Sequence, residues 1–393
     1  MGKSSRVRHR RTYSLMVLVA LLALGAVGCG GSGSSTSSGS STSGGGSTES
    51  SSGGKFAALE EFIAEYEKEP TQIAAKRALA SKPKPGEKII FLQCAVTQCA
   101  QQGIGIKEAV ESVGWTVETA NYDSADPSTL ITQLQDALTK DPAAVVFSGS
   151  PEEIWSQMIP AYEKAGVALI PMFIGPAKVE GPVIANIAGE LENEIAGKLL
   201  ADWFIVNSEG KGTALIQAVP GFPAITIWVE YFEEEVAKEC PGCSVEVVES
   251  SLEELGDGSS TQTMLSALQR NSDARYVLSY NGAFIAGLPT EAQNAGLPEI
   301  KVGTYASTGD YVAEAARGKD YGLILLSNIY TGWLSTNAAL LNEEGVQMKP
   351  EEELLPIQLA TKDSATQELA ETANNFTAPS DYQEQFKQLW GAG

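Results

Sequence analysis

The stretch DPAAVVFSGSPEEIWSQMIPAYEKAGVALIPMF, residues 141–173, combines two apolar runs with an amphipathic segment between them. The runs at 143–147 and 167–173 are apolar almost throughout, as strands buried on both faces of a sheet are. Residues 152–165 have helical periodicity, and Ser150 followed by Glu153 is typical of a capping box. The stretch therefore predicts a strand, a crossover helix and a second, parallel strand.

The same alternation continues before this stretch and restarts after it. Before it, strands are predicted at 88–93 and 115–121, and helices at 102–113 and 127–140. After a helix at 191–206, strands are predicted at 213–219, 244–248, 276–279, 301–303 and 323–326. The accompanying helices are predicted near 224–238, 261–270, 283–295 and 310–317. Because the chain is too long for one core, we expect an α/β fold with two doubly wound parallel-sheet lobes.

The N-terminus has the pattern of an export signal. Five basic residues precede an apolar run at 15–28, which is too short to span a bilayer but suits a signal peptide. The run ends in AVGC, which resembles a bacterial lipobox, so residues 1–28 are predicted to be removed and Cys29 to carry lipid. A plain secretory signal is the alternative, and either the general or the twin-arginine export route is open. Residues 29–54 are Gly/Ser-rich and are predicted to be a tether.

Charge and histidine content exclude several functions. Removing residues 1–28 takes away five of the 27 basic residues and none of the 49 acidic ones, which leaves a net charge of 22 − 49 = −27. Such a surface repels nucleic acid, which binds through Lys and Arg. The single histidine, His9, would be removed with the predicted signal peptide. The remaining chain could then form neither a Ser-His-Asp centre nor a His-ligated metal site. We therefore expect no nucleic-acid partner, no cofactor and no metal.

Several segments resemble the type 1 periplasmic binding proteins, especially the ribose- and galactose-binding branch, over residues 86–390. The segments are GIKEAVESVGWTV (105–117), DPAAVVFSGS (141–150), AGVALIPMF (165–173), NEIAGKLLADWF (193–204) and YNGAFIAGLPTEAQNAG (280–296). The resemblance implies a hinge of three crossings near 174–176, 327–330 and 350–354. Lobe 1 would be 86–175 plus 329–352, and lobe 2 would be 176–328 plus 353–393. Residues 55–85 would form an N-terminal helix and linker.

The resemblance implies a monomeric, lipid-anchored solute-binding protein of an ABC importer, which works outside the cytoplasmic membrane with a permease as its partner. Gly282 stands where the sugar-binding branch has a ligand-contacting aspartate, and the branch's arginines are missing from the strand ends. A neutral polar ligand, most simply a sugar, is therefore expected. The alternatives are a chemosensory or signal receptor of the same fold, and an extracellular hydrolase using carboxylates such as Asp123, Glu152 and Glu153.

Ligands of such folds bind beyond the carboxyl ends of the strands, where aromatic faces and amides position them. The resemblance therefore implies that seven residues line the cleft: Gln98, Ser148, Phe173, Phe222, Asn281, Tyr305 and Asn328. Three of them have a structural alternative. Phe173 could complete the core, Phe222 could pack in the core, and Asn281 before Gly282 is a common turn pair.

The remaining cysteines form two close pairs, Cys94 with Cys99 and Cys240 with Cys243. Because disulfides persist outside the cytoplasm, we expect each pair to form a local disulfide. A four-cysteine zinc site is one alternative, although it would have to join opposite ends of the fold. A redox-active pair at Cys240-Pro-Gly-Cys243 is the other. The first disulfide would fix the loop that presents Gln98 to a ligand.

Overall fold

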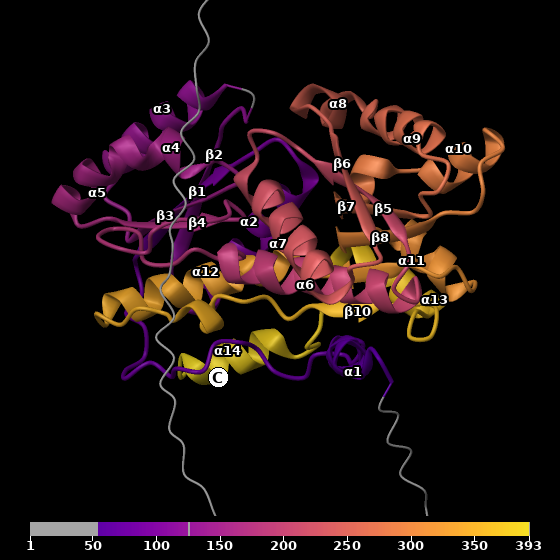
Figure 1. The fold of residues 1–393 in the computed structure, drawn as a ribbon. Helices are drawn as coiled ribbons and strands as arrows, with labels where there is room; N and C mark the ends of the chain where they lie inside the picture. Colours follow the sequence, from indigo (N-terminus) through magenta and orange to yellow (C-terminus); the bar gives the residue numbers. More distant parts are fainter. Residues whose placement is uncertain (1–53, 125, 393) are drawn as a thin grey trace, which may run out of the picture. The chain divides into compact units, whose positions relative to one another are not determined.

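A computed structural model of the protein describes residues 54–124 and 126–392 (Figure 1). The predicted signal peptide, the predicted lipidation site Cys29 and nearly all of the predicted tether lie outside these residues. Among the helices that the structure describes, none is long and apolar enough to cross a membrane.

Lobe 1 is built on a parallel sheet of four strands in the order β2-β1-β3-β4. The strands are β1 (Lys88–Gln93), β2 (Thr116–Asn121), β3 (Ala144–Ser148) and β4 (Ala168–Met172). Its helices are α2 (Thr97–Ser112), α3 (Pro127–Leu138), α4 (Glu152–Trp155) and α5 (Ile159–Ala165), with the 3₁₀ turn η1 (Ser156–Met158) between the last two. All of β3 and β4 is buried, whereas β2 lies at the sheet edge and is largely exposed. The apolar runs of 141–173 thus form the interior of this lobe, as predicted.

Lobe 2 is built on six strands in the order β10-β9-β8-β7-β5-β6, of which only β10 is antiparallel to its neighbour. The strands are β5 (Thr213–Ala218), β6 (Ser244–Glu249), β7 (Tyr276–Asn281), β8 (Lys301–Ala306), β9 (Gly322–Leu325) and β10 (Gln358–Ala360). Its helices are α6 (Glu190–Asn207), α7 (Pro223–Glu239), α8 (Leu252–Asp257), α9 (Ser260–Arg270), α10 (Leu288–Asn294), α11 (Gly309–Ala316) and α13 (Gln367–Thr372). The 3₁₀ turns η2 (Gly282–Ile285) and η4 (Ala373–Asn375) complete it. The expected architecture of two parallel-sheet α/β lobes is therefore present.

The chain leaves lobe 1 later than predicted. Residues 176–187 fold back along the free edge of β4, where Val183 bridges Leu169 and Ile187 bridges Met172. The backbone N–H of Phe173 also donates to the carbonyl of Ile187 at 2.9 Å. The first crossing therefore lies just before α6, and the predicted boundary at residue 175 is too early because this edge of the sheet recruits one more segment.

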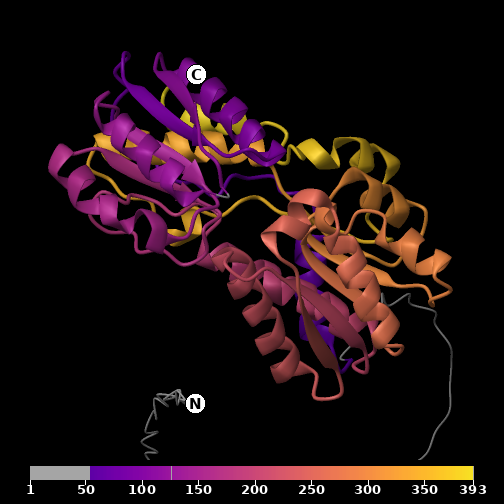
Figure 2. The same ribbon diagram turned by 90° about the horizontal axis from the view of Figure 1, so that it is seen from above.

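The C-terminus also differs from the predicted division. Helix α12 (Asn328–Glu343) packs on α2 of lobe 1, and the 3₁₀ turn η3 (Pro350–Glu352) follows it. Helix α14 (Tyr382–Leu389) then packs on α12, with the Trp390 ring stacked on Trp333 at 5.5 Å. Figure 2 shows the C-terminus on the lobe formed by the indigo and magenta part of the chain. The last residues therefore belong to lobe 1, not to lobe 2 as predicted, because these aromatic rings find their partners there.

Helices α2 and α12 approach each other at two glycines. A side-chain carbon at Gly332 would lie 2.2 Å from the backbone nitrogen of Ile106, and one at Gly105 would lie 1.9 Å from the carbonyl oxygen of Ile329. Only glycine allows backbones to come this close. The contact holds the middle of α2 against the segment that returns from lobe 2.

Candidate functional site

Lobe 1 has a cavity of about 500 Å³ at the carboxyl ends of β1 and β2. It is lined by Gln93, Cys94, Ala95, Val96, Thr97, Ala100, Asn121 and Tyr122. None of these eight side chains is charged, and the set combines amide, hydroxyl and small apolar groups. The cavity therefore suits a neutral ligand with several hydrogen-bonding groups.

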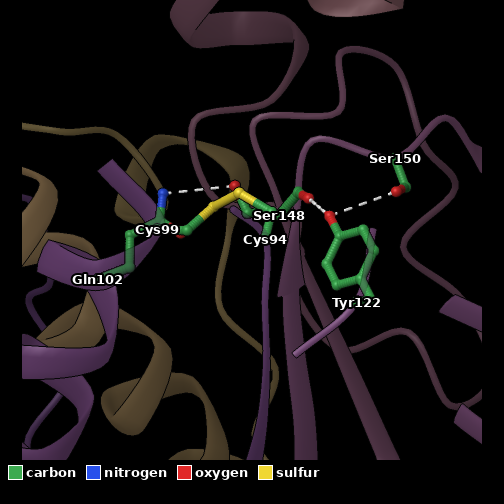
Figure 3. The surroundings of a disulfide bond; sticks show 6 residues. All are labelled: Cys94, Cys99, Gln102, Tyr122, Ser148 and Ser150. Atoms are coloured by element: carbon green, nitrogen blue, oxygen red, sulfur yellow. Dashed lines mark hydrogen bonds between the residues drawn. A yellow bond between two sulfur atoms is a disulfide. The ribbon is translucent and has the colours of Figure 1, made fainter. Parts of the chain in front are cut away.

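Cys94 lines this cavity, and its disulfide with Cys99 ties the loop after β1 to the first turn of α2 (Figure 3). One turn further, Gln102 is buried and its Nε2 donates to Ser148 Oγ at 3.3 Å. The Tyr122 hydroxyl donates to the carbonyl oxygen of Ser148, and Ser150 lies on its other side. These contacts join the ends of β1, β2 and β3 into one rigid edge.

The corresponding edge of lobe 2 has its own buried polar network. Gln217 at the end of β5 donates to Ser250 Oγ at 2.9 Å and accepts from Ser279 Oγ at 2.7 Å. All three residues are buried. The network holds the ends of β5, β6 and β7 in register, as the Ser148 contacts do in lobe 1.

The two edges meet at the N-terminus of α7. A side-chain carbon at Gly149 would lie 3.7 Å from the Phe222 ring, and one at Gly175 would lie 2.9 Å from the Ala224 nitrogen. Phe222 is half-buried and comes from the loop after β5, so its ring lies between the lobes. Phe173, at the end of β4, has a φ of 52°, which is unusual for a residue with a side chain. The structure thus brings Phe222 close to Gly149, the neighbour of the predicted residue Ser148.

The other predicted residues have different surroundings. Gln98 is half-buried in α2 between two cavity-lining residues but does not itself line the cavity. Asn281 accepts from the Ala283 backbone N–H at 2.9 Å, so it forms the turn that was its structural alternative. Asn328 begins α12 and donates to Gln101 Oε1 at 3.3 Å. Ser148 is buried, and its hydroxyl accepts from Gln102.

Tyr305 differs most from its predicted role, because it is fully buried. Its hydroxyl donates to Glu192 Oε1 at 3.2 Å, while the Leu355 backbone N–H donates to Glu192 Oε2 at 3.0 Å. The contacts link β8 and α6 to the third crossing, so Tyr305 supports the hinge instead of facing a ligand. The sequence pattern places Tyr305 near the end of a strand. It does not indicate whether the side chain faces a ligand or is buried in the protein.

Three carboxylates at the hinge are buried, Glu192, Glu352 and Glu353, and Glu352 pairs with Arg77. Burial raises the pKa of Glu192 to about 7, although its hydrogen bonds from Leu355 and Tyr305 favour the charged form. Burial likewise raises the pKa of Glu353 to about 7, against the hydrogen bond that the Asn186 backbone N–H donates. The hinge therefore carries groups that change charge near neutral pH.

The second disulfide, Cys240–Cys243, closes a turn between α7 and β6. This turn precedes β6, at the end of the lobe 2 sheet away from the strand carboxyl ends. Both cysteine pairs are bonded in the structure, as the local-disulfide interpretation predicted. Only the first pair contributes to the cavity, because the second lies at the end of the lobe 2 sheet away from the strand carboxyl ends.

Residues Asn121 and Tyr122 contribute to the cavity but were missed from sequence. Asn121 is the last residue of β2 and Tyr122 follows it, so the rule that placed Ser148 and Phe173 at strand ends would also have found them. Cys94, which follows β1 directly, also lines the cavity.

Two arginines have partners outside the cavity. Arg77 pairs with Glu352 at 3.2 Å, and Arg275 donates to backbone carbonyls before β7. Neither arginine lines the cavity.

Two parallel sheets whose carboxyl ends meet at one polar site define the class of two-lobed α/β binding proteins. The sequence model of the periplasmic binding protein domain matches residues 97–345. The chain therefore belongs to the periplasmic binding protein family, in its type 1 form, and is a binding protein, not an enzyme. A comparison with curated proteins finds no match.

Solved structures with the same fold are distant in sequence. An ABC sugar transporter subunit from Rhodobacter sphaeroides is 16% identical, with a TM-score of 0.61 over 71% of this chain and 99% of its own. A carbohydrate transporter solute-binding protein from Agrobacterium radiobacter, in complex with D-arabinose, is 17% identical, with a TM-score of 0.60 over 76% and 100%. A 5-methylthioribose transporter solute-binding protein from Thermotoga lettingae is 13% identical, with a TM-score of 0.62 over 80% and 99%. These likenesses show the fold.

Proposed function

We propose that the protein is a lipid-anchored solute-binding protein of an ABC importer that captures a small neutral sugar between its lobes. The observation that carries this proposal is the cavity of about 500 Å³ at the strand ends of lobe 1, which has no charged lining residue. A carboxylate or phosphate ligand would favour an arginine fork, which this edge lacks. Several solved structures of the same fold come from sugar transporters, which supports a sugar over other neutral ligands.

The ligand would contact both lobes. Asn121 and Thr97 would hydrogen-bond hydroxyl groups from the lobe 1 side, and the Phe222 ring would cover an apolar sugar face from the lobe 2 side. Contacts on both lobes would favour the closed form over the open one, and a permease would bind the closed form. No chemical step is required.

The anchor and the permease are the parts of the proposal that rest on sequence. Cys29 follows the apolar run and precedes a Gly/Ser-rich tether, which would let the lobes reach a permease from an anchored N-terminus. Replacing Cys29 with serine in the full chain should release the protein from the membrane fraction. Retention of the Cys29→Ser protein by membranes would contradict lipid anchoring at this residue.

A thermal-shift screen of the chain from residue 55 tests the ligand class. The panel would contain pentoses, hexoses, polyols, nucleosides and, as the opposing class, sugar phosphates and dicarboxylates. A neutral sugar at 100 times its Kd should stabilise the protein by about 2.7 kcal/mol. If only the anions raised the Tm, the neutral-ligand proposal would be wrong.

A further inference from the structure

The residues before lobe 1 connect both lobes on the side of the hinge where α1 and α14 lie. We name residues 67–81 the strap; they follow α1 (Ala57–Tyr66) and precede β1. The family sequence model begins only at residue 97, so the strap lies outside the matched part of the chain. Figure 1 shows this indigo segment running from α1 past α14.

The start of the strap is fixed to lobe 2. Helix α1 packs against α6 and β10, and its half-buried aromatic and aliphatic residues join the main core. At the first strap residue, the Glu67 carboxylate accepts from the Thr361 hydroxyl at 2.6 Å. The Glu67 carbonyl also accepts from Gln358 Nε2 at 3.0 Å. Both partners lie in or just after β10, which is part of the lobe 2 sheet.

The rest of the strap is fixed to lobe 1. Gln385 of α14 donates to the Thr71 carbonyl at 3.1 Å and accepts from the Ile73 N–H at 3.0 Å. Ile73 is buried, and the Leu79 N–H donates to the Leu389 carbonyl at 2.9 Å. The Glu344 carboxylate, just after α12, accepts from the backbone of Ala80 and Ser81.

Only three residues lie between the two anchors, so Glu67 and Thr71 are four residue steps apart. A fully extended chain spans at most about 3.6 Å per residue, so Glu67 and Thr71 cannot move more than about 14 Å apart while both remain bound. Lys68 and Glu69 between them are exposed. A connection this short limits the relative motion of the two bodies to which it is bound.

We propose that the strap is a built-in limiter of lobe motion, which restricts the range of lobe separations that the hinge would otherwise allow. The three crossings alone leave the lobes free to rotate about the hinge. The strap adds a further connection with its own anchor on each lobe. This proposal concerns the ligand-free protein and therefore stands or fails separately from the proposed ligand.

The test cuts the strap without removing either anchor. A site-specific protease sequence is inserted between Lys68 and Glu69, and spin labels are placed as noncanonical residues at Gln135 on α3 and Gln269 on α9. Both positions are exposed, one on each lobe. Double electron–electron resonance then gives the distribution of interlobe distances before and after cutting. The proposal predicts a broader distribution after cutting; an unchanged width would overturn it.

Two controls separate a limiter from a merely stabilising segment. The same protease sequence inserted at Gly256, an exposed position within lobe 2, should leave the distance distribution unchanged after cutting. Flexible insertions of 4, 8 and 12 residues between Lys68 and Glu69 keep the chain intact, and they should broaden the distribution progressively. A distribution that did not respond to insertion length would contradict the limiter even if cutting altered the Tm.

Discussion

At the scale of single residues, the two disulfides have the same chemistry but different surroundings. Cys94 lines the cavity, whereas the Cys240–Cys243 pair closes a turn at the opposite end of lobe 2 from the strand carboxyl ends. Loops of this size gain about 2 kcal/mol from cross-linking in the chain-entropy account. The pairs should therefore contribute similar stability but affect binding differently.

Replacing both members of each pair with serine separates the two effects. Cys94→Ser/Cys99→Ser should lower the Tm and weaken the affinity for the sugar found by the screen at least several-fold, because the cavity wall is no longer fixed. Cys240→Ser/Cys243→Ser should lower the Tm alone. Calorimetric melting and titration of both variants measure this. Equal losses of affinity would show that the first disulfide has no special relation to the ligand.

The buried Glu192 carboxyl should make the stability of the folded protein fall as the pH rises. Its pKa is raised from 4.5 to about 7 in the folded protein, so the folded state binds the proton more tightly than the unfolded state. The stabilisation that this bound proton gives the folded protein is complete below about pH 4.5. It is lost as the pH rises to about 7. Its size is about 3 kcal/mol at most.

Glu192→Gln keeps the shape and stays neutral, so its Tm should fall less than that of the wild type between pH 4.5 and 7. Melting curves across this range measure the difference. The matched control is Glu194→Gln, two residues along the same helix with its side chain 33% exposed. The assignment fails if both variants follow the wild-type profile.

At the scale of elements, the α2–α12 contact holds the helix that follows the cavity-lining loop of lobe 1. Gly332→Ala would place a carbon 2.2 Å from the Ile106 nitrogen, which the packed backbones cannot accommodate without moving apart. The expected destabilisation is about 1–3 kcal/mol, as for other overpacked cores. The control is Gly256→Ala, where nothing lies within 4 Å of the added carbon. Chemical unfolding should show a loss for the first and little change or a small gain for the second.

How much the sequence could reveal also differs between elements. Buried parallel strands such as β3 and β4 were predictable because their apolar runs leave no alternative. β10 was missed because three residues without periodicity carry no pattern, and it becomes a strand only by pairing with β9. Residues 152–165 were predicted as one helix, but Pro160 and the turn at Ser156–Met158 divide it. Among the predicted site residues, Phe222 lies at the contact between the lobes, whereas Tyr305 is buried. The order of the strands along the chain does not indicate how deeply a residue at a strand end is buried.

At the scale of the whole molecule, two lobes, a hinge with buried carboxylates and a strap form one binding protein. Each lobe edge is rigid by itself, since Gln102 and Ser148 fix one and Gln217, Ser250 and Ser279 fix the other. We therefore expect motion to occur in the segments between the lobes. Ligand affinity would then depend on how closely these preformed edges can approach.

Binding of a sugar between the lobes is tested by calorimetric titration of the sugar identified by the screen into the wild type and three variants. Asn121→Ala removes a lobe 1 group, Phe222→Ala removes the lobe 2 ring, and Gln135→Ala on the exposed face of α3 is the control. The account predicts that each of the first two variants weakens binding about tenfold or more, which is 1.4 kcal/mol, while the control binds like the wild type. Wild-type affinity in both Asn121→Ala and Phe222→Ala would show that the ligand does not bind between the lobes.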